Sequence, residues 1–399
     1  MNWPLFPTNQ TFALALLSGA VGLSRFIPFR RGRPVGLSGS KRRLLELRER
    51  CLTSHPDVSS GAAWFATESG PSACLRYLRS GTGDGKPTLL LLHGAHASAV
   101  ALLPLIDAVR ATHRVFALDL PGWGVSDALR GTDVDGRTDA VVDALRWFVD
   151  AVVRVDEAPI SVYAHSLGAY YALELARRYP EAVSDLVLAC PAGLFSTLGT
   201  SGAYWALLFA TSAHHRLLRA LRWFVVPLVE ACARGPEARF RARLACSGYE
   251  GASMLAEHIR FDPRNASWRR PSLEALSTVR ARTSLLFGER DGLIPAHQGD
   301  ALLRLSKGEL HCRSLREAPH CVHGDDRSVS EIARVIEDRE SRRAAPSNIA
   351  SIAEGASRLK RNGAHALGAS FDRRISLARI VHVYEIMLDA RFDSDLVQP

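Results

Sequence analysis

Ala164-His165-Ser166-Leu167-Gly168 lies between an apolar run, residues 160–163, and a segment with helical spacing, residues 169–179. This order predicts a strand, a sharp turn and a helix, with the serine at the turn. A serine hydroxyl is a poor nucleophile unless it is held clear of the backbone, next to a base and beside backbone N–H donors. Such strings also occur by chance in plain loops, and Ala164 replaces the first glycine of the usual GxSxG form. The stretch indicates a nucleophile only if the chain also supplies partners for Ser166.

The body of the chain alternates apolar runs with segments of helical pattern. Near-continuous apolar strands separated by helices are typical of a parallel sheet that is covered on both faces. We therefore predict the α/β class, with a doubly wound and mostly parallel sheet. The expected strands are residues 87–92, 114–118, 160–163, 184–189, 283–287 and 310–315.

A long interruption separates the fourth and fifth of these apolar runs. Residues 192–279 are too many for a loop in a compact unit, and the part from 204 to 229 is rich in aromatic residues, leucine and basic residues. We predict a helical lid inserted after the sixth core strand. Its apolar side either faces substrate or membrane, or simply packs on the core.

Composition and pattern divide the 399 residues into six segments. In order, they are an apolar and basic targeting or membrane-associating segment (1–37), a leading helix and first strands (38–74), the first part of the core (75–191), the lid (192–279), the second part of the core (280–340) and a partly disordered tail (341–399).

Positive charge is concentrated at the N-terminus. The whole chain has a formal net charge of +9, and residues 1–50 contain nine basic and two acidic residues. This placement favours a membrane surface or a targeting role for the N-terminal segment over a nucleic-acid groove in the body. Zinc-finger spacing and RNA-binding aromatic patterns do not occur in the sequence, so no nucleic-acid partner is expected.

The apolar stretch 11–24 precedes the first charged residue, Arg25. It fits a signal anchor or interfacial hairpin, an organelle-targeting sequence or a disordered start, because it is short for a spanning helix and lacks the basic start of a secretory signal. Seven widely spaced cysteines without a CxxC favour free thiols and a reducing compartment. We therefore expect a membrane-associated intracellular location, endomembrane or mitochondrial, in preference to secretion.

The chain supplies an acid and a base after Ser166, in an order that suits serine catalysis. Asp291 follows the strand 283–287 in a glycine-flanked turn, with Glu289 as the alternative acid. His320 follows the strand 310–315, with His323 as the alternative base. We predict that Ser166 is the nucleophile, His320 the base and Asp291 the acid that orients it.

The oxyanion of a tetrahedral intermediate also needs backbone donors. The amide of Leu167 is one candidate, and the loop after residue 92 offers the amide of Ala95 as the other. His96 and His165 are candidates for lining the substrate site, although both can instead be structural. Because the histidines lie on different loops without a close HxxxH pair, no metal and no cofactor is expected.

Together, HG at 93–94, DLPGWG at 119–124, AHSLG at 164–168, GERDGLIP at 288–295 and the His320 loop resemble the α/β-hydrolase superfamily of serine hydrolases. The resemblance covers roughly residues 75–338. It implies a carboxylic ester hydrolase, such as an esterase or lipase, that forms an acyl-enzyme on the serine and releases the acyl group to water or to an acceptor alcohol. A serine at 166 argues against the branches that carry an aspartate there.

His320 and Asp325 have the HxxxxD spacing of the branch that contains the lipid-droplet lipase coactivator, N-acylphosphatidylethanolamine lipase and the cardiolipin lipases. That similarity implies deacylation of phospholipids or lysophospholipids, with Asp325 in an acyltransferase motif. Asp325 can instead cap the following helix. The expected partners are a lipid or ester substrate and a membrane surface met by the N-terminal segment and the lid. The alternatives are a catalytically weak lipid- or lipase-binding scaffold, or a hydrolase of a small soluble ester, a proline peptide or a C–C bond.

Overall fold

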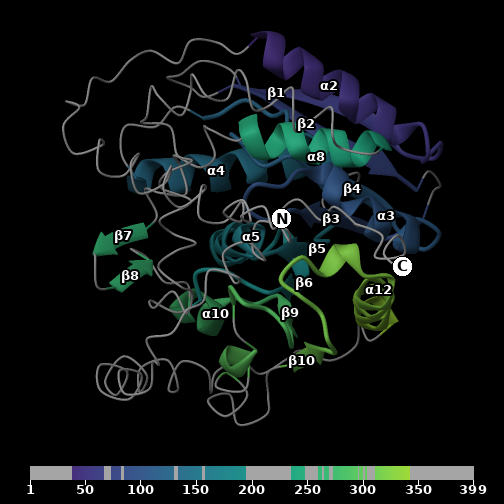
Figure 1. Cartoon of the computed structure of the whole chain (residues 1–399). Coiled ribbons are helices and arrows are strands. Elements are labelled where there is room, and N and C mark those ends of the chain that lie inside the picture. Colours follow the sequence, from purple (N-terminus) through teal and green to yellow (C-terminus); the bar gives the residue numbers. More distant parts are fainter. Residues whose placement is uncertain are drawn as a thin grey trace, which may run out of the picture.

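The computed structural model describes residues 38–66, 73–81, 85–129, 134–154, 158–194, 235–247, 259–262, 265–268, 273–294, 296–299, 302 and 311–341. Within them, an eight-stranded sheet has the strand order β1-β2-β4-β3-β5-β6-β9-β10 (Figure 1). β2 pairs antiparallel with β1 and β4, and all other neighbours are parallel, which confirms the predicted mostly parallel sheet. The strands are β1 (Ser59–Phe65), β2 (Ala73–Ser80), β3 (Thr88–Leu92), β4 (Arg114–Leu118), β5 (Ile160–His165), β6 (Val183–Ala189), β9 (Arg282–Gly288) and β10 (His311–Leu315).

Helices cover both faces of the sheet, as the apolar character of the central strands requires. α3 and α12 contact each other on one side, whereas α4 and α10 contact α5 on the other (Figure 1). The central strand β5 is buried along its whole length between these layers. The helices of the core are α3 (Leu103–Val109), α4 (Val134–Phe148), α5 (Leu167–Arg178), α10 (Leu273–Thr278) and α12 (Asp326–Ser341), and α2 (Ser38–Leu52) precedes the first strand.

The six strands expected from apolar runs all form, with ends within two residues of the predicted ones. β1 and β2 are a different case, because the sequence only indicated first strands somewhere before residue 75. β1 is an edge strand whose residues are mostly exposed or half-buried, so it carries no apolar run. β2 begins at Ala73 and crosses the boundary drawn at residue 74.

Between β6 and β9 the structure describes α8 (Gly235–Ser247), the antiparallel pair of β7 (Ile259–Asp262) and β8 (Asn265–Trp268), and α10, which contacts α5 of the core. α8 packs against α2 and buries Phe240 and Leu244 (Figure 1). The aromatic part of the expected lid, the N-terminal segment 1–37 and most of the tail lie outside the described residues. In the part of the chain that is described, none of the helices is long and apolar enough to cross a bilayer.

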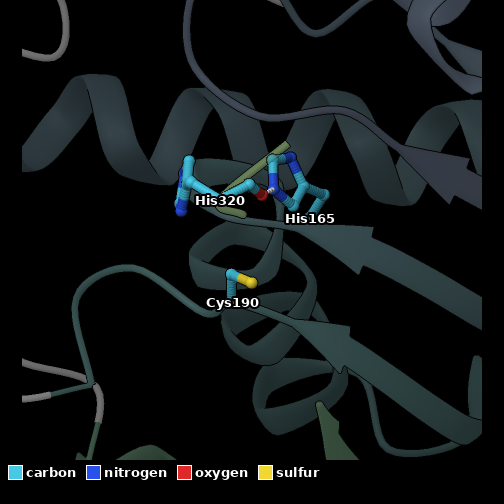
Figure 2. A group of neighbouring side chains, drawn as sticks. All are labelled: His165, Cys190 and His320. Carbon is cyan, nitrogen blue, oxygen red and sulfur yellow. Dashed lines mark hydrogen bonds between the residues drawn. The ribbon is translucent and has the colours of Figure 1, made fainter. Parts of the chain in front are cut away.

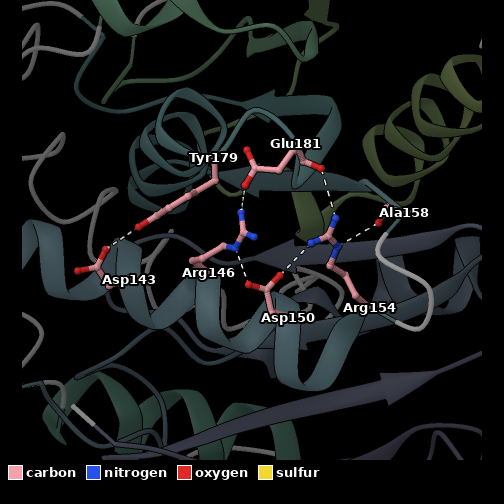
Figure 3. Close-up of polar contacts among 7 residues, drawn as sticks. All are labelled: Asp143, Arg146, Asp150, Arg154, Ala158, Tyr179 and Glu181. Carbon is pink, nitrogen blue, oxygen red and sulfur yellow. Dashed lines mark hydrogen bonds and ion pairs between the residues drawn. The ribbon is translucent and has the colours of Figure 1, made fainter. Parts of the chain in front are cut away.

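A network of charged side chains joins α4 to α5 where the parallel strands begin (Figure 3). Arg146 pairs with Asp150 and Glu181 and lies over the ring of Tyr179, at 4.9 Å from its centroid. Arg154 joins Asp150 at 3.0 Å. These pairs are partly exposed, so each contributes modestly to the free energy of unfolding. These pairs lie at the amino ends of the strands, which leaves the carboxyl ends of the strands for chemistry.

Candidate active site

Ser166 occupies a strained turn between β5 and α5. Its φ is +50° and its ψ is −115°, values that a residue with a side chain adopts only when the surrounding structure imposes them. The turn is tight because α5 approaches β3 closely: a Cβ on Gly168 would lie 2.5 Å from the carbonyl oxygen of His93. Ala164, in the first small position of the motif, is fully buried between β3 and β6. The predicted strand, turn and helix are therefore present, with Ser166 at the turn.

The structure brings Ser166, His320 and Asp291 together from the loops after β5, β10 and β9. His320 Nε2 lies 3.0 Å from Ser166 Oγ, and His320 Nδ1 lies 2.7 Å from Asp291 Oδ2. The other carboxylate oxygen, Oδ1, accepts hydrogen bonds from the amides of Leu293 and Ile294 at 2.7 and 2.8 Å. All three side chains of this constellation are buried. The arrangement has the connectivity of a nucleophile, a general base and an orienting acid.

The two alternative residues lie elsewhere. Glu289 accepts a hydrogen bond from the amide of Glu317 at 2.9 Å, at an exposed position. His323 lies 2.7 Å from the hydroxyl of Tyr163. Neither hydrogen bond reaches Ser166, so the geometry favours His320 as the base and Asp291 as the acid.

The expected oxyanion donors flank Ser166. Leu167 is the first residue of α5, where amides are not used by the helix itself. Ala95 follows Gly94, whose Cβ, if present, would lie 3.0 Å from Ser166 Cβ, so this loop lies against the turn. His93 fixes the loop: its Nδ1 donates to the Gly94 carbonyl at 2.7 Å and its Nε2 accepts from Leu120 N at 3.0 Å. Burial lowers the pKa of His93, which agrees with a neutral ring in this role.

His96 stands in the same loop with a φ of +55°, the backbone region that usually selects glycine. Its ring makes a T-shaped contact with the ring of Trp123, with the two ring centroids 5.0 Å apart. Its side chain is half-buried, one residue from Ala95. The contact with Trp123 gives His96 a structural role in the loop, and its partial exposure beside the proposed oxyanion site keeps it a candidate for contact with substrate.

A family model described as serine aminopeptidase, S33, matches residues 83–327. The chain belongs to this family of α/β hydrolases. It is 29% identical over 320 residues to 1-acylglycerol-3-phosphate O-acyltransferase of Arabidopsis thaliana, covering 70% of this chain and 74% of that protein. It is 25% identical over 275 residues to 2-hydroxy-6-oxononadienedioate/2-hydroxy-6-oxononatrienedioate hydrolase of Escherichia coli strain K12, covering 65% of this chain and 90% of that protein.

Two solved structures share the fold of this S33-family hydrolase at low sequence identity. A membrane phospholipase A, described as a bacterial virulence factor, is 20% identical with a TM-score of 0.55 and covers 84% of this chain and 98% of its own. A thermophilic esterase from Thermogutta terrifontis is 18% identical with a TM-score of 0.50, and the match covers 70% of this chain and 98% of the esterase chain. The eight-stranded sheet described above is thus the α/β-hydrolase sheet, and the predicted superfamily is confirmed.

Two further histidines of this hydrolase lie beneath His320. His165 Nε2 is 2.8 Å from the carbonyl oxygen of His320, and the ring of His323 stands edge-on to that of His165 with centroids 5.0 Å apart. Burial, with smaller contributions from His320 and His323, holds the pKa of His165 well below its ordinary value. Burial also lowers the pKa of His323, to about 3. Both rings are therefore neutral at physiological pH.

These neutral histidines predict a loss of stability in acid. Below pH 6.5 the unfolded chain takes up a proton at His323 that the folded protein excludes until about pH 3, so the free energy of unfolding falls as the pH falls through this window. Within this window, each such histidine lowers the free energy of unfolding by about 1.4 kcal/mol for each unit by which the pH falls. Urea midpoints measured at several values from pH 7 to 5 should therefore decline less steeply for His323→Phe than for the wild type. The exposed His297→Phe serves as the control, and equal slopes for wild type and His323→Phe contradict the expectation.

His165, Cys190 and His320 have potential metal-ligand atoms within 4.8 Å of one another (Figure 2). Their chemistry fits a metal poorly. Both ring nitrogens of His320 are taken by Ser166 and Asp291, and His165 Nε2 is taken by a carbonyl oxygen. Burial, followed by the charge of Asp291, raises the pKa of the Cys190 thiol well above its ordinary value, so the thiol is protonated beside Asp291. The hydrogen bonds of His320 therefore favour its place beside Ser166 and Asp291 over a place in a metal site.

Asp325 lies at the start of α12. Its carboxylate accepts hydrogen bonds from the amide of Ser328 at 2.9 Å and from its hydroxyl at 2.5 Å. These bonds lower the pKa of Asp325 and are those of a helix cap. The HxxxxD spacing is thus divided between His320 in the constellation and Asp325 in the cap of the next helix.

Cys190 is a site residue that the sequence did not indicate. It follows β6 with a φ of +44°, and its amide donates to Leu286 O at 2.7 Å. The protonated thiol lies beside Asp291 and donates a hydrogen bond to it. No role was predicted for this position from the sequence. The sequence feature that could have indicated Cys190 is its position directly after β6, because β6 lies next to β9, the strand that Asp291 follows.

Proposed function

We propose that the protein is a serine hydrolase that cleaves a carboxylic ester of a lipid, in the class of phospholipids and lysophospholipids. The observation that carries this proposal is the pair of contacts made by His320, 3.0 Å to Ser166 Oγ and 2.7 Å to Asp291 Oδ2. A buried serine held in reach of an oriented imidazole is the arrangement required for nucleophilic attack on an acyl group.

In the proposed reaction, Ser166 Oγ attacks the ester carbonyl while its proton passes to His320 Nε2. Asp291 accepts the hydrogen bond from Nδ1 and stabilises the imidazolium that forms. The amides of Ala95 and Leu167 donate to the oxyanion of the tetrahedral intermediate. His320 then gives the proton to the departing alcohol. Water, or an acceptor alcohol, attacks the acyl-enzyme and loses a proton to His320. His320 then returns that proton to Ser166 Oγ as the bond from Ser166 to the acyl carbon breaks, which releases the acid or a new ester and restores the free serine.

A lipid substrate is supported by the Arabidopsis relative, whose name describes acyl transfer to an acylglycerol phosphate. The basic N-terminal segment and the long insertion are consistent with contact between the protein and an anionic membrane surface. The E. coli relatives favour a second candidate, hydrolysis of a small soluble acid, because they match a similar share of this chain. The two candidates differ in the acyl group that the site should prefer.

A series of p-nitrophenyl esters from acetyl to dodecanoyl separates these candidates. For a lipid hydrolase, kcat/KM is expected to rise by roughly a hundredfold from acetyl to octanoyl, since each buried methylene contributes up to about 0.8 kcal/mol and only part of the chain needs to be buried. Rates are measured below the micelle concentration and corrected with Ser166→Ala protein. A sharp preference for the acetyl ester contradicts the lipid proposal and favours the small-substrate candidate.

A further inference from the structure

His320 sits in a loop, yet its ring must keep a fixed distance from Ser166. A catalytic group has to be held within about 0.5 Å of its working position, and loops hold residues less tightly than strands do. Part of the His320 loop is fixed from the Asp291 side: Arg290 N donates to Ala318 O at 2.9 Å. That contact ends two residues before His320, so a further restraint on His320 itself is needed.

His165 provides such a restraint. Its Nε2 lies 2.8 Å from the carbonyl oxygen of His320, and Val322 N donates to the same oxygen at 3.0 Å. A carbonyl only accepts hydrogen bonds, so His165 must carry its proton on Nε2. Figure 2 shows the ring of His165 facing the backbone of His320, and the two rings lie with their centroids 4.9 Å apart. The bond therefore acts on the position of the His320 backbone and leaves both ring nitrogens to Asp291 and Ser166.

His165 also precedes Ser166 directly, at the end of β5. The strand that carries the nucleophile thus holds the backbone of the base through the adjacent residue. A shift of β5 moves Ser166 and the His165 restraint together, which keeps the distance between Ser166 and His320 constant.

The ring of His165 is itself fixed on two sides. His323 stands edge-on to it and is held by Tyr163, whose hydroxyl lies 2.7 Å from His323 Nε2. Tyr163 and His165 alternate with Ala164 on β5, so both side chains project from the same face of the strand. On the other side Gly94 leaves room for the ring, because a Cβ there would lie 2.8 Å from His165 Nδ1.

We propose that His165 is a positioning residue, whose hydrogen bond to the His320 carbonyl sets the distance between the base and Ser166, with His323 and Tyr163 holding its ring in place. This inference rests on the proposed function of Ser166 and His320. It assigns His165 no contact with substrate, so it predicts an effect on turnover and not on substrate binding.

The test compares His165→Leu, which removes the donor, with His165→Gln, whose side-chain amide can still donate. Misplacement of a catalytic group by about 1 Å lowers kcat by roughly a hundredfold, and this is the loss expected for His165→Leu with KM within about twofold. His165→Gln should recover at least about tenfold of that loss. The matched control is His113→Leu, the same change at a buried histidine just before β4, at the amino ends of the parallel strands and away from Ser166.

Several outcomes overturn the proposal. They are a folded His165→Leu protein with the kcat of the wild type, a His165→Gln protein as impaired as His165→Leu, or an equal loss of kcat in His113→Leu. If His165→Leu does not fold, Tyr163→Phe removes only the hydroxyl bound to His323 and should still lower kcat by about fivefold at constant KM. Wild-type kcat in Tyr163→Phe then overturns it. Fluorophosphonate labelling of Ser166→Ala protein reports separately on the proposed function.

Discussion

Ser166→Ala is expected to lower kcat by about a millionfold and to abolish labelling by a fluorophosphonate. The reason lies in the geometry: Ser166 Oγ, 3.0 Å from His320 Nε2, is the atom that would form the acyl bond. Alanine leaves the proposed oxyanion donors, the amides of Ala95 and Leu167, in place, so a small residual rate above that in water should persist. Turnover and labelling are measured on the same purified protein, with the unfolding temperature as a check on the fold.

Ser184→Ala is the control for this experiment. Ser184 lies near the start of β6, at the amino ends of the parallel strands, opposite the end where Ser166 lies. Its hydroxyl donates to Ile160 O at 3.3 Å. The variant loses a serine hydroxyl without touching the site, so labelling should match that of the wild type. Undiminished labelling of Ser166→Ala would show that another residue is the nucleophile and would remove the proposed mechanism.

Asp291→Asn is expected to lower kcat by about ten-thousandfold. Asp291 Oδ2 now accepts a hydrogen bond from His320 Nδ1, which leaves Nε2 free to take the proton of Ser166. An asparagine amide in this place can donate to Nδ1 instead, and the ring proton then moves to Nε2, where it blocks the transfer. The expected result is a loss of kcat with little change in KM. Both constants are measured with the ester that the chain-length series identifies as the best substrate.

Glu289→Gln distinguishes the two acids that the sequence offered. Its carboxylate accepts a hydrogen bond from Glu317 N at an exposed position, so the substitution should change kcat by less than about threefold. A large loss in Glu289→Gln together with an active Asp291→Asn protein would contradict the assignment of the acid. Because Asp291 Oδ1 also receives the amides of Leu293 and Ile294, unfolding of Asp291→Asn must be measured beside its activity.

The sequence predicted the central sheet well because both of its faces are covered. Strands buried on two sides must be apolar throughout, so residues 87–92 and 160–163 were visible as runs. β1 lies at the edge of the sheet and follows no such rule. The order of Ser166, Asp291 and His320 was also visible, since each follows an apolar run and the carboxyl ends of parallel strands meet at one edge.

The support of the site was less visible in the sequence. Tyr163 and His323 are separated by 160 residues, and neither follows a pattern that marks it as a partner of the other. Cys190 contributes a hydrogen-bonding thiol at a position for which no role was predicted from the sequence. Such contacts depend on how loops fold back over the sheet, which local periodicity does not encode. The candidate reacting residues were therefore easier to predict from the sequence than the residues that hold them in position.

α8, a helix of the insertion, packs against α2, which precedes the first strand. The hydrogen bonds of Ser166, Asp291 and His320 described above join residues from the loops after β5, β9 and β10, outside the insertion. Because Ala192 N donates to Ser166 O at 3.1 Å, residues 192–194 should be kept. A chimera that exchanges residues 195–272 for those of another S33-family hydrolase can then alter the choice of substrate while keeping the reaction. Phe240 and Leu244, buried where α8 packs on α2, are the residues that such a graft must match.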